Sequence, residues 1–253
     1  MGNGYGFGGE EIKEESSWRY PIGIFLATLV LCAIFLYYYV GPSVEEFKGD
    51  LPSPAITEEA ISIQIADHVF APAANYTVYP RARRGGARDE VSLYALWPNM
   101  SGYAPTHRRE FVDDQPQTRR INIVISKRTA PITEAERLET LYLPHTVDRR
   151  GVRTPYQLTK FSFSERRVNV PTNGYGDTEL FVGADEDENT VALFCYKERV
   201  DIPSPECWRV YEYSDEIEVS YRFKRPYLPE WRAIDTEVRK YVAGIDRSAA
   251  ASQ

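Results

Sequence analysis

Histidine, cysteine and methionine are scarce in this chain of 253 residues, which holds three, three and two of them. His68, His107 and His145 lie far apart in the sequence, and the chain has no HExxH or CxxC pattern, so no zinc site is indicated. It also lacks a Gly-x-Ser-x-Gly nucleophile elbow and a glycine-rich phosphate loop after a strand. These absences leave no catalytic motif, and we expect neither a metal nor another cofactor.

Charge is missing altogether from residues 21–40, PIGIFLATLVLCAIFLYYYV. Twenty uncharged residues are enough for an α-helix to cross about 30 Å of hydrocarbon. Aromatic residues gather at both ends of the stretch, as they do at membrane–water boundaries. A buried helix of a soluble protein is the alternative interpretation, and a cleaved signal peptide would need a shorter apolar run before small residues. We predict a retained transmembrane signal anchor, with the lipid bilayer as its surroundings.

Basic residues near this stretch indicate its orientation. Lys13 and Arg19 precede it, and only Lys48 occurs in the twenty residues after it, which favours a cytoplasmic N-terminus by the positive-inside rule. Arginine outnumbers lysine 23 to 7, which is typical of GC-rich coding sequences and favours a bacterial source. We therefore predict a bacterial inner-membrane protein whose C-terminal domain lies in the periplasm.

This scheme divides the chain into five segments. They are a flexible Gly-rich and acidic cytoplasmic tail (1–20), a transmembrane helix (21–40), a proline-containing stalk (41–55), a mainly-β periplasmic domain (56–247) and a disordered C-terminal tail (248–253).

The domain alternates apolar and polar residues in many short runs, the pattern of half-buried strands. The expected strands are 61–66, 69–70, 76–79, 91–97, 121–126, 156–164, 179–182, 191–196, 207–213 and 217–223, the last three forming an antiparallel meander. A capping box that begins at Thr133 predicts a short helix to about Tyr142. We expect an α+β domain with mainly antiparallel strands, for which a two-sheet sandwich is one arrangement that fits.

The chain is expected to end in an amphipathic helix that begins near Pro229. Its apolar residues recur at helical spacing and form one stripe: Ile234, Val238, Tyr241, Val242 and Ile245. Because such a stripe must be covered, we expect the helix to pack against the sheet.

Two of the three cysteines, Cys195 and Cys207, fall on neighbouring strands of the predicted meander. An even number of cysteines in an exported domain indicates a disulfide. Cys32 lies in the apolar stretch and serves there as a small apolar residue. Two free, buried cysteines are the alternative interpretation of the pair.

Charge is distributed unevenly along the chain. Residues 1–80 carry 3 basic and 10 acidic side chains, residues 81–170 carry 17 and 10, and residues 171–253 carry 10 and 17. Two interpretations stay open: the basic middle pairs with the acidic flanks inside one fold, or it forms an exposed surface for an anionic partner. The candidate contact surface is a loop with a Gly-Gly turn that carries Arg81, Arg83, Arg84 and Arg88. A nucleic-acid partner is not expected for an exported domain.

Together, an anchor, a well-formed domain and no residues at catalytic spacing predict a non-enzymatic protein that acts by protein contact. It would serve as a scaffold, an assembly factor or an accessory subunit of an envelope complex. The alternative is a membrane-tethered envelope hydrolase, because dispersed carboxylates and histidines can converge in space without leaving a pattern in the sequence.

Overall fold

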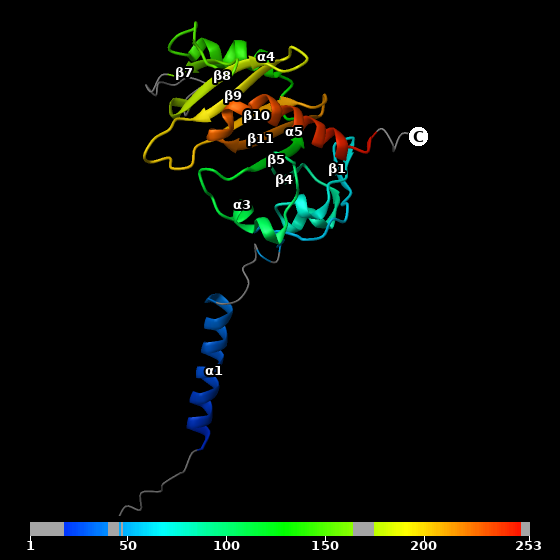
Figure 1. Cartoon of the computed structure of the whole chain (residues 1–253). Helices are drawn as coiled ribbons and strands as arrows, with labels where there is room; N and C mark the ends of the chain where they lie inside the picture. The colour runs from blue at the N-terminus through cyan, green and yellow to red at the C-terminus, as the bar shows by residue number, and fades with distance from the viewer. Residues whose placement is uncertain (1–17, 40–45, 47, 164–174, 249–253) are drawn as a thin grey trace, which may run out of the picture. The chain divides into compact units, whose positions relative to one another are not determined.

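A computed structural model describes residues 18–39, 46, 48–163 and 175–248. The chain forms two compact units, Met1–Phe47 and Lys48–Gln253 (Figure 1). Residues 1–17 of the predicted tail 1–20, residues 249–253 of the predicted tail 248–253, and residues 41–45 and 47 of the predicted stalk 41–55 lie outside the described residues.

The first unit contains one long apolar helix, α1 (Arg19–Tyr39). None of its residues is buried against the rest of the chain, and its length and composition suit a membrane crossing. The prediction of one N-terminal apolar helix is confirmed, with a start two residues earlier than expected from the uncharged stretch.

The second unit is built on one eight-stranded sheet in the order β4-β5-β11-β10-β9-β8-β7-β6 (Figure 1). Every neighbouring pair of strands is antiparallel. The strands are β4 (Glu90–Leu96), β5 (Arg120–Lys127), β6 (Val152–Arg153), β7 (Thr159–Ser162), β8 (Thr178–Ala184), β9 (Thr190–Tyr196), β10 (Glu206–Glu212) and β11 (Ile217–Lys224). The predicted antiparallel β-domain and its meander β9–β10–β11 are confirmed. The described strands lie in this sheet and one small sheet, and the large sheet is covered by helices rather than by a second large sheet as in a sandwich.

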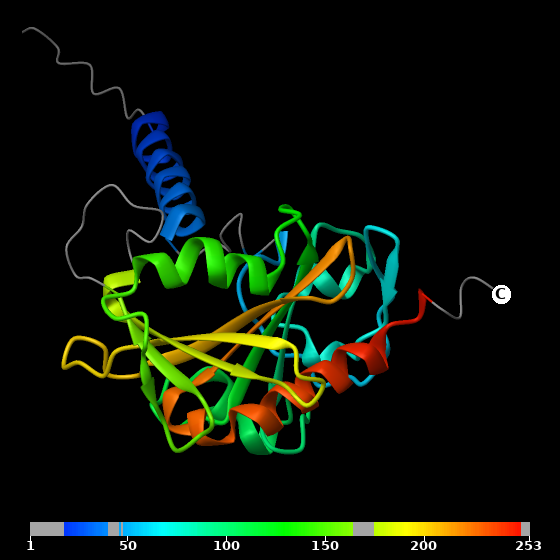
Figure 2. The ribbon, with the colours of Figure 1, turned by 90° about the horizontal axis from the view of Figure 1, so that it is seen from above.

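Helices lie on both faces of the large sheet (Figure 2). The helix α5 (Trp231–Ile245) packs on one face, in a core that includes Ile123, Val219 and Leu193. The helix α4 (Glu134–Arg137) and the π-helical turn after it (Leu138–Tyr142) cover the other face over β7 to β9. Alternate residues of β8 and β9 therefore enter two separate cores.

The predicted C-terminal stripe is confirmed as the buried side of α5. Ile234, Val238 and Val242 are fully buried, and Tyr241 and Ile245 pack at the edge of the same core. Pro229 does not start this helix: it lies in a preceding 3-10 helix (Arg225–Glu230), where its fixed φ is equally tolerated.

The capping box of the short helix is also confirmed. The Thr133 hydroxyl accepts a hydrogen bond from the Glu136 amide, and the Glu136 carboxylate accepts one from the Thr133 amide. These bonds satisfy amides that the first turn of a helix leaves without partners.

A small sheet, β2-β1-β3, lies beside α5 and shares its core. Its strands are β1 (Ile63–Ile65), β2 (His68–Phe70) and β3 (Gly86–Ala87). The strand predicted at 76–79 is wrong: Ala74–Tyr76 is a 3-10 helix, because the amides of Tyr76 and Thr77 bond back to the carbonyls of Ala73 and Ala74. Only Thr77 forms a β-bridge, to Leu93.

A further short helix, α3 (Arg108–Val112), packs on the Tyr94 side of β4.

The predicted disulfide joins Cys195 of β9 to Cys207 of β10, which lie directly opposite each other in the ladder. Both cysteines are fully buried. The bridge closes the nine-residue connection 197–205 between the two strands.

Removal of this bridge by Cys195→Ala with Cys207→Ala should lower the free energy of unfolding by roughly 3 kcal/mol, because the loop it closes gains freedom in the unfolded chain. Thiol titration of the unfolded full chain without reductant should find one reactive thiol, that of Cys32, and none in a Cys32→Ala control. Three reactive thiols would contradict the bridge and favour a cytoplasmic domain.

Candidate functional site

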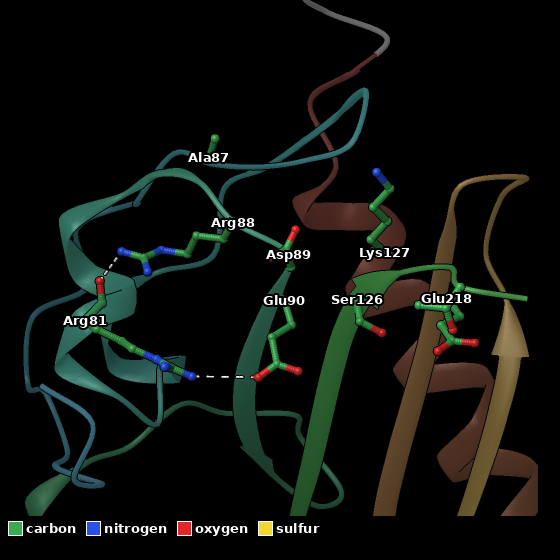
Figure 3. Close-up of a pocket in the computed structure, with 9 residues that line it drawn as sticks. Arg81, Ala87, Arg88, Asp89, Glu90, Ser126, Lys127 and Glu218 are labelled. Carbon is green, nitrogen blue, oxygen red and sulfur yellow. Dashed lines mark hydrogen bonds and ion pairs between the residues drawn. The ribbon is translucent and has the colours of Figure 1, made fainter. Parts of the chain in front are cut away.

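An open cleft of about 720 Å³ lies where β4 begins, β5 ends and β11 begins (Figure 3). Charged side chains of both signs dominate its lining, which consists of Arg81, Ala87, Arg88, Asp89, Glu90, Ser126, Lys127, Thr129 and Glu218. We call this hollow the charged cleft.

Strand register places one row of side chains along the floor of the charged cleft. Glu90 pairs with Ser126, and Ser126 pairs with Glu218, so the three side chains lie side by side on one face of the sheet (Figure 3). Lys127 and Asp89 project from the strand ends at the rim. No described residue forms an ion pair with Asp89, Lys127 or Glu218, so these charges are available to a binding partner.

The four predicted contact arginines lie in one loop, and two of them, Arg81 and Arg88, line the cleft. The 3-10 helix Pro80–Arg84 carries three of them, and Arg88 follows the Gly-Gly turn. Gly85 has φ of +66°, and a Cβ there would meet the Ser62 carbonyl oxygen at 2.7 Å, so the turn requires glycine.

Two of these arginines, Arg83 and Arg88, hold the loop in place. Arg83 donates to Thr77 Oγ1 and to the Ser53 carbonyl, and Arg88 donates to the carbonyls of Arg81 and Gly85. Side-chain bonds to backbone carbonyls fix the loop at one wall of the cleft, and the charge of Arg88 is left without an anionic partner among the described ion pairs.

Arg81 pairs with Asp50 at 3.1 Å and with Glu90 at 3.7 Å. Residues 48–55, which the sequence suggested as part of the stalk, thus contact the domain through Asp50 and through Ser53, whose amide donates to the Val78 carbonyl. Other basic residues of the middle segment also pair with the acidic flanks, as Arg137 does with Glu212 and Lys160 with Glu179. These pairs follow the internal-pairing interpretation of the charge distribution.

A buried ionic cluster lies inside the sheet. Arg209 on β10 donates to Glu134 on one side and to Asp235 on the other, at 2.8 and 2.6 Å. The side chains of Arg209, Glu134 and Asp235 are only 1%, 6% and 3% exposed. The Tyr221 hydroxyl donates to Asp235 Oδ1 at 2.8 Å.

Burial alone would lower the pKa of the Arg209 guanidinium, but attraction and hydrogen bonds from Glu134, with a contribution from Asp235, raise it above its ordinary value. Arg209 therefore stays charged. Because solvent does not reach this cluster, we interpret it as a structural bridge between α4 and α5 rather than as a site of chemistry.

The cluster also fills a gap in the ladder between β9 and β10. These strands pair only from Cys207 to Arg209. Beyond that point the Ala192 amide donates to Glu134 Oε1 at 2.7 Å, and the Val210 carbonyl accepts from Arg137 at 3.1 Å. Side chains of α4 thus supply hydrogen bonds that the neighbouring strand does not.

The histidines do not converge. His68 Nδ1 donates to Asp246 Oδ2 at 2.9 Å, next to the Tyr213 hydroxyl, which donates to the same oxygen. Burial alone would raise the pKa of Asp246, but hydrogen bonds from Ser248, His68 and Tyr213 lower it to about 2. Within the described residues, no group of three or more potential ligands is placed to hold a metal ion.

Comparisons with known proteins give one match in structure. No protein-family model matches the chain, and no curated protein matches its sequence. Among solved structures, it is similar to Smlt3025, an immunity protein of the Stenotrophomonas maltophilia type IV secretion system. The TM-score is 0.52, the identity is 16%, and the match covers 75% of this chain and 94% of that chain. The likeness is one of fold.

The sequence pointed to the arginine loop but not to the rest of the charged cleft. Glu90, Ser126 and Glu218 belong to three strands that are separated by up to 128 positions, and only the register brings them together. The single signal in the sequence was that Ser126 and Glu218 occupy polar positions of alternating strands; Glu90 falls just before the strand predicted at 91–97.

Proposed function

We propose that this chain is a single-pass protein of the bacterial inner membrane, with its N-terminus in the cytoplasm and its domain in the periplasm, and that the domain binds another protein. The apolar helix α1 and the disulfide Cys195–Cys207 support this location, since disulfides persist in oxidising compartments. Other envelope proteins and proteins that enter the periplasm are the proposed partners.

The observation that carries the proposal of protein contact is the charged cleft. Its rim presents Lys127 beside Asp89, and Glu218 lies at its floor. A cleft with charges of both signs complements a protein surface whose charges have the opposite arrangement. A polyanion such as nucleic acid would be repelled by the carboxylates of the cleft. The arginine loop, with Arg81, Arg83, Arg84 and Arg88, forms one wall of the proposed contact surface.

The proposed partner is a toxic effector protein that the domain neutralises. Support comes from the similarity of fold to a secretion-system immunity protein, which is an argument from analogy. A domain that acts in this way needs a rigid, charged surface rather than a reaction centre, and Arg83 and Arg88, which donate to backbone carbonyls, provide such rigidity.

The test is affinity purification of the full anchored chain from its own membranes. The variant Lys127→Glu with Asp89→Lys reverses two rim charges and keeps the net charge, and both side chains are exposed, so the fold should be unaffected. One envelope or secreted protein should co-purify with the wild type, and its recovery should fall about tenfold in the variant, because rim charges mainly steer association.

The matched control is Lys240→Glu with Glu237→Lys, which swaps an exposed ion pair on α5, the helix that packs on the opposite face of the large sheet from the cleft floor. It should leave recovery unchanged. If no protein co-purifies with the wild type in near-stoichiometric amount, the proposal of protein contact is wrong. Equal losses in both variants would contradict the role of the cleft.

A further inference from the structure

One face of the large sheet is only partly covered. On β5 and β11 the residues that face α5 are fully buried, whereas the alternate residues, apart from the buried Lys224, are half-buried or exposed. We call these alternate residues, together with their neighbours on β4 and β10, the open face: Ser92, Asn122, Val124, Ser126, Trp208, Val210, Glu218, Ser220 and Arg222. It lies between the region covered by α4, over β7 to β9, and the Tyr94 side of β4, which is covered by α3.

Strand register places Trp208 and Arg222 next to each other in the open face. Phe194, Trp208, Arg222 and Asn122 pair in turn across β9, β10, β11 and β5. The row is aromatic up to Trp208, which stacks on Phe194 with ring centroids 5.6 Å apart. At Arg222 the row becomes polar and exposed to solvent.

The guanidinium of Arg222 is held in place but has no anionic partner. It lies over the Trp208 ring at 5.4 Å from the centroid. Its lateral neighbours in the ladder, Trp208 and Asn122, are uncharged, and no described residue forms an ion pair with it. An arginine held over an aromatic ring keeps its fork of N–H groups free for a carboxylate, at little loss of side-chain freedom on binding.

The opposite end of the open face carries negative charge. Glu218 lies four residues before Arg222 on the same strand and the same face, about 13 Å away at the rise of a β-strand. Ser220 and Val124, between the two ends, are small and uncharged. A nucleic acid or an anionic membrane that met Arg222 would also meet Glu218 and Glu90, so this pattern favours a protein surface with charges of both signs.

We propose that a protein partner covers the open face and places an Asp or Glu carboxylate on the Arg222 guanidinium, with the half-buried Trp208 as the anchor beneath it. Tryptophan and arginine are the residues most often found at the energetic centre of protein interfaces. This inference rests on the proposed function, and it extends the contact surface from the charged cleft, which shares Ser126 and Glu218 with the open face, to the far end of β11.

The experiment places the photo-cross-linking residue p-benzoylphenylalanine at Ser220 of the full anchored chain, in its own cells. A matched chain carries it at Lys240, on the outer side of α5. Illumination should link position 220, and not position 240, to the same protein that co-purifies with the wild type. Arg222→Ala should weaken binding of that purified protein about 30-fold, as expected at the centre of an interface. Arg222→Lys keeps the charge without the fork of N–H groups, so its affinity for the partner should lie between those of the wild type and Arg222→Ala.

Charge reversal makes the test specific. Arg222→Glu should abolish the adduct at position 220. When the acidic residue of the partner that contacts Arg222 is changed to Arg, the altered partner should bind the Arg222→Glu variant and not the wild type. Thermal unfolding of each Arg222 variant should match the wild type, since the side chain is exposed.

The remaining outcomes overturn the inference. If a partner co-purifies but neither links at 220 nor responds to Arg222→Glu, the proposed function stands and the open face is not its surface. An adduct of twice the mass of the chain, or an adduct with lipid, would identify a second copy or the bilayer as the occupant. If no protein co-purifies, the proposed function fails together with this inference.

Discussion

Arg209→Met should lower the free energy of unfolding of the domain by about 3–5 kcal/mol, the usual loss when one partner of a buried ion pair is removed. The wild-type guanidinium serves two carboxylates, Glu134 and Asp235, in a region closed to solvent. Methionine fills most of the volume of the arginine stem but offers no charge. The variant would therefore keep two buried carboxylates without their cation.

Chemical unfolding in urea, followed by circular dichroism, measures this loss. The triple change Arg209→Met with Glu134→Gln and Asp235→Asn removes the unpaired charges, so it should recover part of the stability lost in the single variant. Arg222→Met, on the exposed side of the next strand, is the matched control and should change the free energy of unfolding by less than about 1 kcal/mol. A loss below about 1 kcal/mol for Arg209→Met would show that the cluster does not stabilise the fold.

Val238→Asp should unfold the domain or reduce its yield severely. Val238 is fully buried in the core shared by α5 and the large sheet. An aspartate there must either carry a charge into an apolar core or take up a proton, and both options are costly. We expect a loss of about 4 kcal/mol or more, which approaches the whole stability margin of many domains.

The yield of folded chain and the midpoint of thermal unfolding report this effect. Ala233→Asp is the matched control, because Ala233 is exposed near the start of the same helix, where a negative charge is tolerated. Wild-type stability of Val238→Asp would mean that the apolar stripe does not form part of the core. Equal damage in the control would point instead to helix propensity.

Local sequence patterns predicted most of the secondary structure. The alternation of apolar and polar residues in β11 correctly predicted a strand, and the helical spacing of Ile234, Val238 and Val242 correctly predicted a helix. Both patterns arise because the side of an element that is buried carries apolar residues. The disulfide followed from the same reasoning, since Cys195 and Cys207 occupy neighbouring strands of a local meander. The prediction failed at residues 76–79: Tyr76 ends a 3-10 helix held by local hydrogen bonds, and only Thr77 forms a β-bridge.

Long-range neighbours could not be predicted. Glu134 looked like an ordinary residue of the first helical turn, and nothing near it in sequence shows that it meets Arg209, 75 positions away. Arg222 and Trp208 become a pair only when the register of β10 and β11 is known. The sequence therefore indicated the arginine loop as a contact surface, but the open face and its paired charges depend on which strands lie side by side.

The gap between β9 and β10 has a consequence for which substitutions the domain tolerates. Elsewhere in the sheet, neighbouring strands are joined by backbone groups, which every residue except proline supplies, so a change of side chain leaves the hydrogen bonds in place. Here the Ala192 amide and the Val210 carbonyl depend on Glu134 and Arg137. Between β9 and β10, two side chains of α4 supply hydrogen bonds that backbone groups supply elsewhere in the sheet. A single substitution in α4 can therefore remove a hydrogen bond from the sheet.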